Sequence, residues 1–351
     1  MAGNWWTSTH RKYWSFSRER LAALRDELDK QHEKVLQQHP YPDRRLMFIF
    51  LRDRLLQLGK RLPFRQQCVA TALVYMHRYL LSTPMQSVNL YMLVATAFYL
   101  ASKTEESPHH IRLVTSEARS AWPEFVPGDV SRLGEMEFCL ISDMRSQLIV
   151  WHPYRTLNDL KDNQDLKLSS EEVNLAWCII NDSYMTDLPL TCPPHLIAII
   201  AIFLAIVFHP QSKASAMRAP IATNPVMDAD SAGFASIGAR PGMAGALGSA
   251  MHHLPMNPPS SPAIRNGSQN ISASDPSRSA APGKTYGMQA IQTSEKFQNT
   301  LRFLVESEID LHQVIEGTQE IISLYEVWEQ YNEKAIKDAV SRCLKSNTGD
   351  C

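Results

Sequence analysis

The side chains best placed for specific polar contacts follow a long apolar stretch in the first third of the chain. This stretch ends abruptly in Lys103, Glu105 and Glu106, in the run YMLVATAFYLASKTEES. A further carboxylate, Glu137, lies between apolar neighbours in the run GEMEFCLI. The helix dipole favours a lysine near a helix C-terminus, and a carboxylate beside an apolar seam needs a partner. These residues can form ion pairs and hydrogen bonds, either in a solvent-exposed salt bridge or with another protein.

Motifs for catalysis, nucleotide binding and metal binding are missing from the sequence. It contains no GxxxxGK[ST], HExxH or GxSxG pattern and no HRD…DFG set. His109-His110 and His252-His253 are adjacent pairs that match no usual zinc spacing. The 6 cysteines include no CxxC pair, which indicates reduced thiols rather than disulfides or a zinc site. We therefore expect no catalytic activity of its own, no cofactor and no metal site.

The charge and hydropathy of the chain argue against binding to nucleic acid or to a membrane. Lys and Arg number 35 against 36 for Asp and Glu, and the formal net charge of −1 disfavours a nucleic-acid or anionic-membrane surface. The longest apolar run, 196–208, has 13 residues, whereas a membrane helix needs about 20. The opening run MAGNWWTSTHRKYW lacks the apolar stretch of a signal peptide. We expect a soluble intracellular protein with no membrane attachment.

Apolar residues recur at helical spacing almost throughout the chain, and no segment shows the alternation of a β-strand. Ser169 and Glu172 have the spacing of a capping box ahead of one helix. The sequence therefore predicts an all-α fold. The expected helices cover 21–35, 46–58, 63–80, 89–103, 111–122, 129–141, 175–184, 196–208 and one long helix over 303–324.

The composition changes sharply in one segment, 211–294. This segment holds 9 of the 21 prolines and 8 of the 14 glycines, and its only aromatic residues are Phe234 and Tyr286. Such a sequence cannot bury enough apolar surface to offset the loss of chain entropy on folding. We predict a disordered insertion here.

An internal repeat indicates two helical bundles of similar size. Three residues in the predicted helix at 89–103 recur 104 positions later: Ala97, Leu100 and Ala101 correspond to Ala201, Leu204 and Ala205. We expect an N-terminal aromatic segment and helix at 1–43 and a first bundle at 44–145. A second bundle at 146–335 is interrupted by the insertion at 211–294, and a tail follows at 336–351.

Several runs carry a resemblance to a known family. The chain resembles the first cyclin box in the runs RQQCVATALVYMHRYL and LVATAFYLASKTEES. It resembles the C-type cyclins in the opening MAGNWWTSTH, in WHPYRTL at 151–157 and in NDSYMTDLPLTCPP at 181–194. The resemblance spans about 44–210 and 294–332, and the long insertion is similar to that of a filamentous-fungal member. C-type cyclins are the cyclin subunits of the kinase module of Mediator, the RNA polymerase II coactivator.

The resemblance implies a non-catalytic regulatory subunit that binds and activates the cyclin-dependent kinase of the Mediator kinase module, in the nucleus. In cyclins the first box grips the C helix of the kinase, and by resemblance Lys103 and Glu137 are the charged contacts. Glu105 and Glu106, of which Glu106 is favoured, are expected to pair with kinase arginines near the activation segment. The second repeat has Val207 at the position of Lys103, so we expect only the first repeat to bind the kinase in this way.

Four aromatic residues, Trp5, Trp6, Tyr13 and Trp14, precede the first predicted helix. Two interpretations are open. They hold this helix against the bundles, or they form, around Trp6, a groove for another subunit of the Mediator kinase module, since exposed tryptophan often anchors an interface. Arg155, in the WHPYRTL run, is a further candidate contact with a partner.

A DNA-binding general transcription factor is the alternative function, because factors of the TFIIB type use the same doubled cyclin fold. That function requires basic helix faces and usually a zinc ribbon. The near-zero net charge and the missing CxxC pairs count against it. The regulatory cyclin is therefore the favoured interpretation, with no direct nucleic-acid contact expected.

Overall fold

The computed structural model describes residues 4–208 and 295–347, and all regular structure in these two ranges is helical. The expected all-α fold is confirmed. The N-terminal segment contains η1 (Trp5–Thr7), α1 (Thr9–Trp14), α2 (Arg18–Gln31) and α3 (Glu33–Gln38). The helix expected over 21–35 is thus interrupted at His32, between α2 and α3. The predicted insertion at 211–294 lies outside the described residues.

The first bundle is built around helix α6 (Leu90–Thr104), which is buried along almost its whole length. The Asn89 side chain caps α6 by accepting hydrogen bonds from the backbone N–H groups of Tyr91 (3.1 Å) and Met92 (3.2 Å). Its neighbours are α4 (Arg44–Gly59), α5 (Gln66–Tyr79), α7 (Ile111–Ala121) and α8 (Val130–Asp143). The short helix η2 (Met85–Ser87) precedes α6 in the chain. The last turn of α6 reaches the surface, where Lys103 is exposed.

The second bundle repeats this plan around α12 (Pro194–Phe208), which packs between α10 (Ser170–Ser183) and α16 (Leu311–Trp328). It also contains α9 (Tyr154–Leu160), α11 (Leu188–Thr191) and α15 (Glu295–Glu306). The capping box of Ser169 and Glu172 forms at the start of α10 as predicted. Although α12 is strongly apolar, no helix among the described residues has the length and apolar character needed to cross a membrane.

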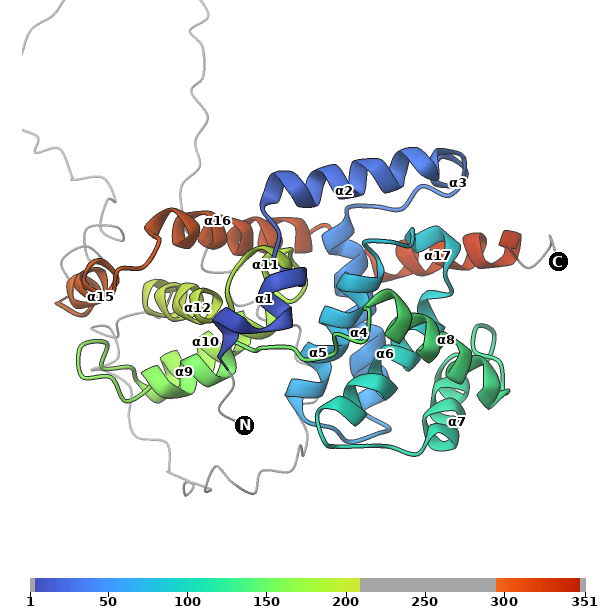
Figure 1. The fold of residues 1–351 in the computed structure, drawn as a ribbon, viewed down its shortest axis with the longest axis horizontal. Helices are drawn as coiled ribbons and strands as arrows, with labels where there is room; N and C mark the ends of the chain where they lie inside the picture. Colours follow the sequence, from blue (N-terminus) through green and yellow to red (C-terminus); the bar gives the residue numbers. More distant parts are fainter. Residues whose placement is uncertain (1–3, 209–294, 348–351) are drawn as a thin grey trace, which may run out of the picture.

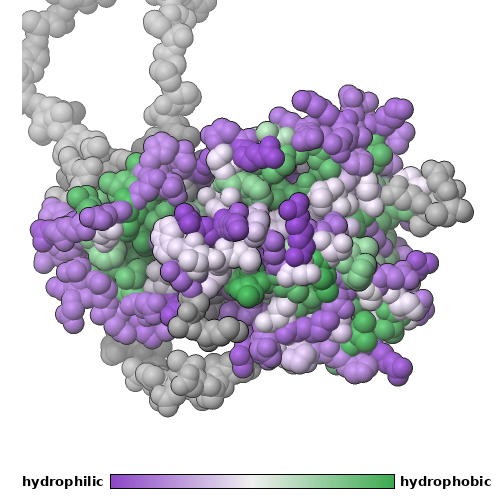
Figure 2. All heavy atoms as spheres, in the orientation of Figure 1, coloured by the Kyte–Doolittle hydropathy of each residue, from purple (hydrophilic) through white to green (hydrophobic). Residues whose placement is uncertain are grey.

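Helix α2 lies outside the bundles and is tied to the second one by ion pairs. It lies along the top of Figure 1, above α4 and beside the end of α16. Arg18 near its start forms ion pairs with α16, and Arg25 pairs with Asp187 just before α11. The outer side of α2 and α3 is hydrophilic (Figure 2). The N-terminal segment is therefore fixed to the bundles on one face and solvated on the other.

The apolar pattern over 303–324 forms two helices, α15 and α16, so the prediction of one long helix is wrong. The break lies at 307–310. There Glu308 adopts a left-handed backbone conformation (φ 51°), which a continuous α-helix does not allow. The Asp310 side chain then caps α16 by accepting from the N–H groups of His312 (3.0 Å) and Gln313 (3.3 Å).

The C-terminal segment, expected to be only a tail from residue 336, contains a further helix, α17 (Glu333–Asn347). Ile336, Val340 and Cys343 on one face of α17 are buried. The helix packs against α4 and η2 of the first bundle. Figure 1 shows α17 running beside α4 toward the C-terminus, far from α15 at the opposite end of the molecule. The chain thus returns to the first bundle after completing the second.

Candidate functional site

Lys103 and Glu137 lie together on the surface of the first bundle. Lys103 belongs to the last turn of α6 and Glu137 to the middle of α8, and the two side chains form an ion pair. The Lys103 side chain is 38% exposed and that of Glu137 14% exposed. The Lys103 ammonium also lies 4.5 Å from the ring centroid of Tyr99, within cation–π range. Packing of α6 against α8 brings together two charges that are far apart in the sequence.

An exposed aromatic side chain lies next to this pair. Phe138 follows Glu137 on α8 and is 73% exposed. The face of α8 that packs into the bundle contains Leu133 and Leu140, both fully buried, so the helical period turns Phe138 outward. Ile149, in the segment after α8, is 65% exposed. Sequence reasoning missed both as surface residues, although the phase of α8 contained the signal for Phe138.

Glu105 points into the protein. Its carboxylate accepts a hydrogen bond from Thr71 Oγ1 (2.5 Å) and lies 3.7 Å from Nε2 of His152. Burial raises the pKa of Glu105, but the hydrogen bonds from His152 and Thr71 outweigh it, so the net pKa is below its ordinary value. Glu105 therefore connects α5 and α6 to the segment between the bundles, and the structure does not present it to a partner.

Glu106 points outward from the end of α6. The N–H of Ser107 donates to Ser102 O (2.8 Å) and the N–H of Glu106 to Lys103 O (3.3 Å), which is the Schellman pattern. Glu106 occupies the left-handed position of this motif (φ 54°), where glycine is usual, and its side chain is exposed. The backbone thus separates two adjacent carboxylates, one half-buried and one exposed beside Lys103.

Two of the four N-terminal aromatic residues belong to the core. Trp5 and Trp14 are each 9% exposed. The Trp14 indole N–H donates to Gln147 Oε1 (2.8 Å), and the Arg78 guanidinium lies 4.9 Å from the Trp14 ring centroid. These contacts hold the N-terminal segment against the junction of the bundles, which is the first of the two interpretations of this cluster.

The other two aromatic residues, Trp6 and Tyr13, are 54% and 42% exposed. Trp6 lies 5.5 Å from the His195 ring, and the Arg11 guanidinium is 5.2 Å from the Trp6 centroid. A cavity of about 410 Å³ opens beside Trp6 and is lined by Arg11, Lys12 and the hydroxyl groups of this segment. The structure therefore leaves an open, cationic groove at Trp6.

Arg155 is exposed on α9 and lies 3.9 Å from Asp159, one turn away on the same helix. The preceding residue, Tyr154, donates to Asn181 Oδ1 (2.7 Å) and its ring lies 4.5 Å from that of Trp177. Trp177 is 40% exposed and was not among the predicted site residues. Among the described residues no cluster of three or more His, Cys, Asp or Glu side chains is arranged to hold a metal ion.

The chain is similar to known proteins over its whole length. The family described as "Cyclin, N-terminal domain" matches residues 22–138. The RNA polymerase II holoenzyme cyclin-like subunit of Emericella nidulans is 44% identical over 100% of both chains. The protein of the same name from Aspergillus fumigatus is also 44% identical over the full length, and that from Neurospora crassa is 38% identical over 99% of both chains. The chain belongs to this cyclin family.

The resemblance to RNA polymerase II cyclins inferred from the sequence is thereby confirmed, and these relatives come from fungi. The cyclin N-terminal match extends from α2 to α8 and contains Lys103, Glu105, Glu106 and Glu137. The aromatic segment before α2 lies outside that match but inside the full-length similarity. The candidate surface around Lys103 thus lies within the part that this cyclin shares with cyclins in general.

Proposed function

We propose that this cyclin is a non-catalytic regulatory subunit that binds and activates the cyclin-dependent kinase of the Mediator kinase module in the nucleus. The first bundle, 44–145, provides the kinase-binding surface. The observation that carries the proposal is the partly exposed Lys103–Glu137 pair beside the exposed Phe138. Large exposed apolar side chains next to partly buried charges are typical of protein interfaces. The names of the relatives support a role with RNA polymerase II.

The pair is suited to a partner because neither charge is fully used within the chain. The Lys103 ammonium has three N–H donors and the Glu137 carboxylate several acceptor positions, of which their mutual contact uses few. The remaining positions can bind backbone or side-chain groups of a kinase helix. A kinase becomes active when its C helix is held inward so that its own Lys–Glu pair forms. Docking against α6 and α8 would hold that helix.

Glu106 and the Trp6 groove extend this proposal in two directions. Glu106, exposed at the end of α6, pairs with kinase arginines near the activation segment in place of a phosphorylated residue. Trp6 and Tyr13, with Arg155 as a separate contact, bind other subunits of the Mediator kinase module. Trp5, Trp14 and Glu105 support these surfaces from within the protein and make no partner contact.

The second candidate function, a DNA-binding general transcription factor of the cyclin fold, is not favoured by any specific observation in the described residues. Their basic side chains at the bundle junction are largely paired with carboxylates. The formal net charge of the chain is −1. The regulatory cyclin thus acts through its kinase partner and requires no cofactor or direct nucleic-acid contact.

Co-purification with the kinase tests the proposal. The wild-type chain is expressed with its candidate kinase beside Lys103→Ala/Glu137→Ala, and complex formation and kinase activity are measured. Arg132→Ala/Glu135→Ala is the matched control, because this pair is on α8 and is about two-thirds exposed. We expect a stoichiometric active complex for the wild type and the control and none for the first variant. Equal binding by all three would show that the kinase does not bind at Lys103 and Glu137. Binding of duplex DNA instead of kinase would favour the DNA-binding transcription factor.

A further inference from the structure

A polar cavity of about 620 Å³ lies where the N-terminal segment and both bundles meet. Two arginines of α2, two arginines at the start of α4 and two glutamates of α16 line it, together with Asp187 and His77. It is separate from the Lys103 surface and from the groove at Trp6, which share none of these residues. Which ligand the cavity can bind depends on which of these charged side chains are already paired with each other.

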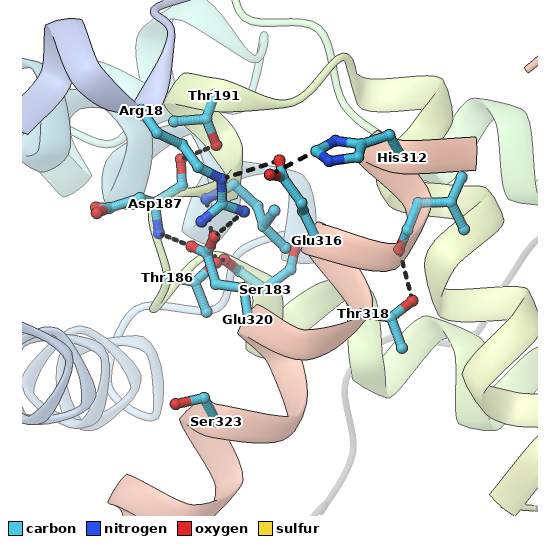
Figure 3. Close-up of polar contacts among 12 residues, drawn as sticks. Arg18, Ser183, Thr186, Asp187, Thr191, His312, Glu316, Thr318, Glu320 and Ser323 are labelled. Atoms are coloured by element: carbon cyan, nitrogen blue, oxygen red, sulfur yellow. Dashed lines mark hydrogen bonds and ion pairs between the residues drawn. The ribbon is translucent and has the colours of Figure 1, made fainter. Parts of the chain in front are cut away.

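The two arginines of α2 are neutralised by carboxylates. Arg18 lies between Glu316 (3.3 Å) and Glu320 (2.8 Å), as Figure 3 shows. Arg25 donates to both carboxylate oxygens of Asp187, at 2.6 and 2.5 Å. Bidentate pairs of this kind use most of the charge and directionality of a guanidinium. The charge of both arginines is thus neutralised within the protein, although the buried Nε of Arg25 has no hydrogen-bond partner.

The two arginines of α4 differ from each other. Arg45 pairs with Asp43 (2.8 Å) and donates to the Ser323 hydroxyl (2.9 Å). Arg44 has no carboxylate within ion-pair distance among the described residues. Its hydrogen bond in this part of the chain is from Nη2 to Leu80 O at 3.3 Å, and its buried Nε has no partner. Arg44 is thus a partly buried cation with free N–H donors at a cavity.

The environment of Arg44 disfavours its positive charge. Burial, together with the charge of Arg25, lowers its pKa to about 10, so it stays charged at neutral pH. The carboxylates of Asp187 and Asp29 raise this pKa, and that of Asp187 is already held by Arg25. The Arg44 guanidinium lies 5.4 Å from the ring centroid of Phe48. A partly buried cation without an anionic partner carries a desolvation cost that an anion in the cavity would offset.

His77 supplies a complementary group at the same cavity. His77 is 1% exposed. Its ring stacks on the ring of Phe48, which also contacts Arg44, and the centroids of the two rings are 3.6 Å apart. Its Nε2 lies 2.9 Å from Tyr184 O; because a carbonyl only accepts, Nε2 carries the proton and Nδ1 is an acceptor. That Nδ1 is buried without a partner. The cavity therefore offers unused donors on Arg44 and an unused acceptor on His77.

We propose that this cavity binds a phosphate monoester, with the Arg44 guanidinium donating to its anionic oxygens and His77 Nδ1 accepting from its P–OH group. A carboxylate or sulfate has oxygens for Arg44 but no proton for His77. The volume of about 620 Å³ exceeds what a phosphate group alone requires. The cavity thus has room for a phosphorylated side chain of a partner protein, which is the ligand that this proposal assigns to it.

Titration of the full-length chain tests the site with inorganic phosphate, sulfate and O-phosphoserine at constant ionic strength. The readouts are the affinity and the ¹⁵N shift of the His77 ring in the wild type, which needs no variant to fold. We expect phosphate to move the Nδ1 resonance and sulfate to leave it unchanged. O-phosphoserine should bind about tenfold more tightly than inorganic phosphate if the cavity is built for a side chain.

Variants separate Arg44 from general charge effects. Arg44→Gln should weaken O-phosphoserine binding by about tenfold or more and Arg44→Lys by less. Arg132→Gln, which removes one exposed arginine away from the cavity, should have no effect. Unchanged binding by Arg44→Gln, or an unmoved Nδ1 resonance at saturating phosphate, would overturn the proposal. Equal affinity for inorganic phosphate and O-phosphoserine would overturn its assignment to a side chain.

Discussion

Helices α6 and α12 hold the same place in their bundles and differ at one end. Each has 15 residues, is buried along most of its length and lies at the centre of its bundle. Helix α6 ends in Lys103, paired with Glu137 of α8. Helix α12 ends in Val207 and Phe208, which are half-buried and apolar.

This difference shows whether an ion pair at the end of the central helix is required for the fold. Since α12 forms the centre of a bundle without a terminal ion pair, such a pair is not required for a cyclin-type bundle to pack. The stability of both bundles comes from apolar burial along the central helix. Lys103 and Glu137 are then an addition to the first bundle, which is expected of residues that serve a partner.

The comparison of α6 with α12 assumes that the two helices are equally well packed. Leu100 of α6 and Leu204 of α12 occupy equivalent positions and are 2% and 1% exposed. Replacing either by alanine should lower the free energy of unfolding by about 2–5 kcal/mol, because each leaves a cavity in a packed core. Chemical denaturation measures both variants. A cost below about 1 kcal/mol for one of them would show that its bundle lacks a comparable core.

Acidification should distinguish the histidines of the two bundles. Burial lowers the pKa of His77 to about 3, with Arg44 and Arg25 lowering it and Asp187 raising it. The unfolded chain takes up a proton near pH 6.5 and the folded chain does not. The contribution of His77 is therefore present above pH 6.5 and is lost as the pH falls toward 3.

Between pH 6.5 and 5 this loss amounts to about 2 kcal/mol for one histidine. His77→Gln should remove that part of the pH dependence of unfolding. His195→Gln on α12 is the matched control and should change the profile much less, because His195 is only half-buried. Parallel profiles for the wild type and His77→Gln would contradict the burial of a neutral His77.

The smallest effect is expected from copying the lysine into the second bundle. In Val207→Lys the new side chain can extend its ammonium to solvent, so the free energy of unfolding should change by about 0.5 kcal/mol or less. Kinase affinity and stoichiometry should stay the same, because α12 itself has no acidic residue with which the new lysine could pair. A second bound kinase per chain, measured by light scattering, would show that the lysine alone defines the surface.

The sequence allowed most of the helices to be predicted, because capping residues and apolar spacing are local signals. Two errors have local causes as well. Ile309 continues the apolar pattern across the break between α15 and α16 and hides the cap at Asp310. The segment from residue 336 was predicted as a tail, although the spacing of Ile336, Val340 and Cys343, all buried on one face of α17, is helical.

The candidate site was predictable as a set of residues and not as an arrangement. Lys103 and Glu137 stood out by type, yet only the packing of α6 on α8 shows that they pair with each other. Glu105 and Glu106 are adjacent and chemically alike, and the turn that ends α6 decides which of them is exposed. Arg44 gave no signal in the sequence, because its lack of a carboxylate partner depends on long-range packing.

Exchange of the two charges tests the central claim most directly. Lys103→Glu/Glu137→Lys keeps an ion pair within the chain but presents reversed charges to a partner. The free energy of unfolding should stay within about 1 kcal/mol of the wild type, since the pair is partly exposed. Kinase affinity, measured by calorimetry, should fall by about 30-fold or more, which corresponds to about 2 kcal/mol. Wild-type affinity in the exchanged variant would show that the pair serves only the fold.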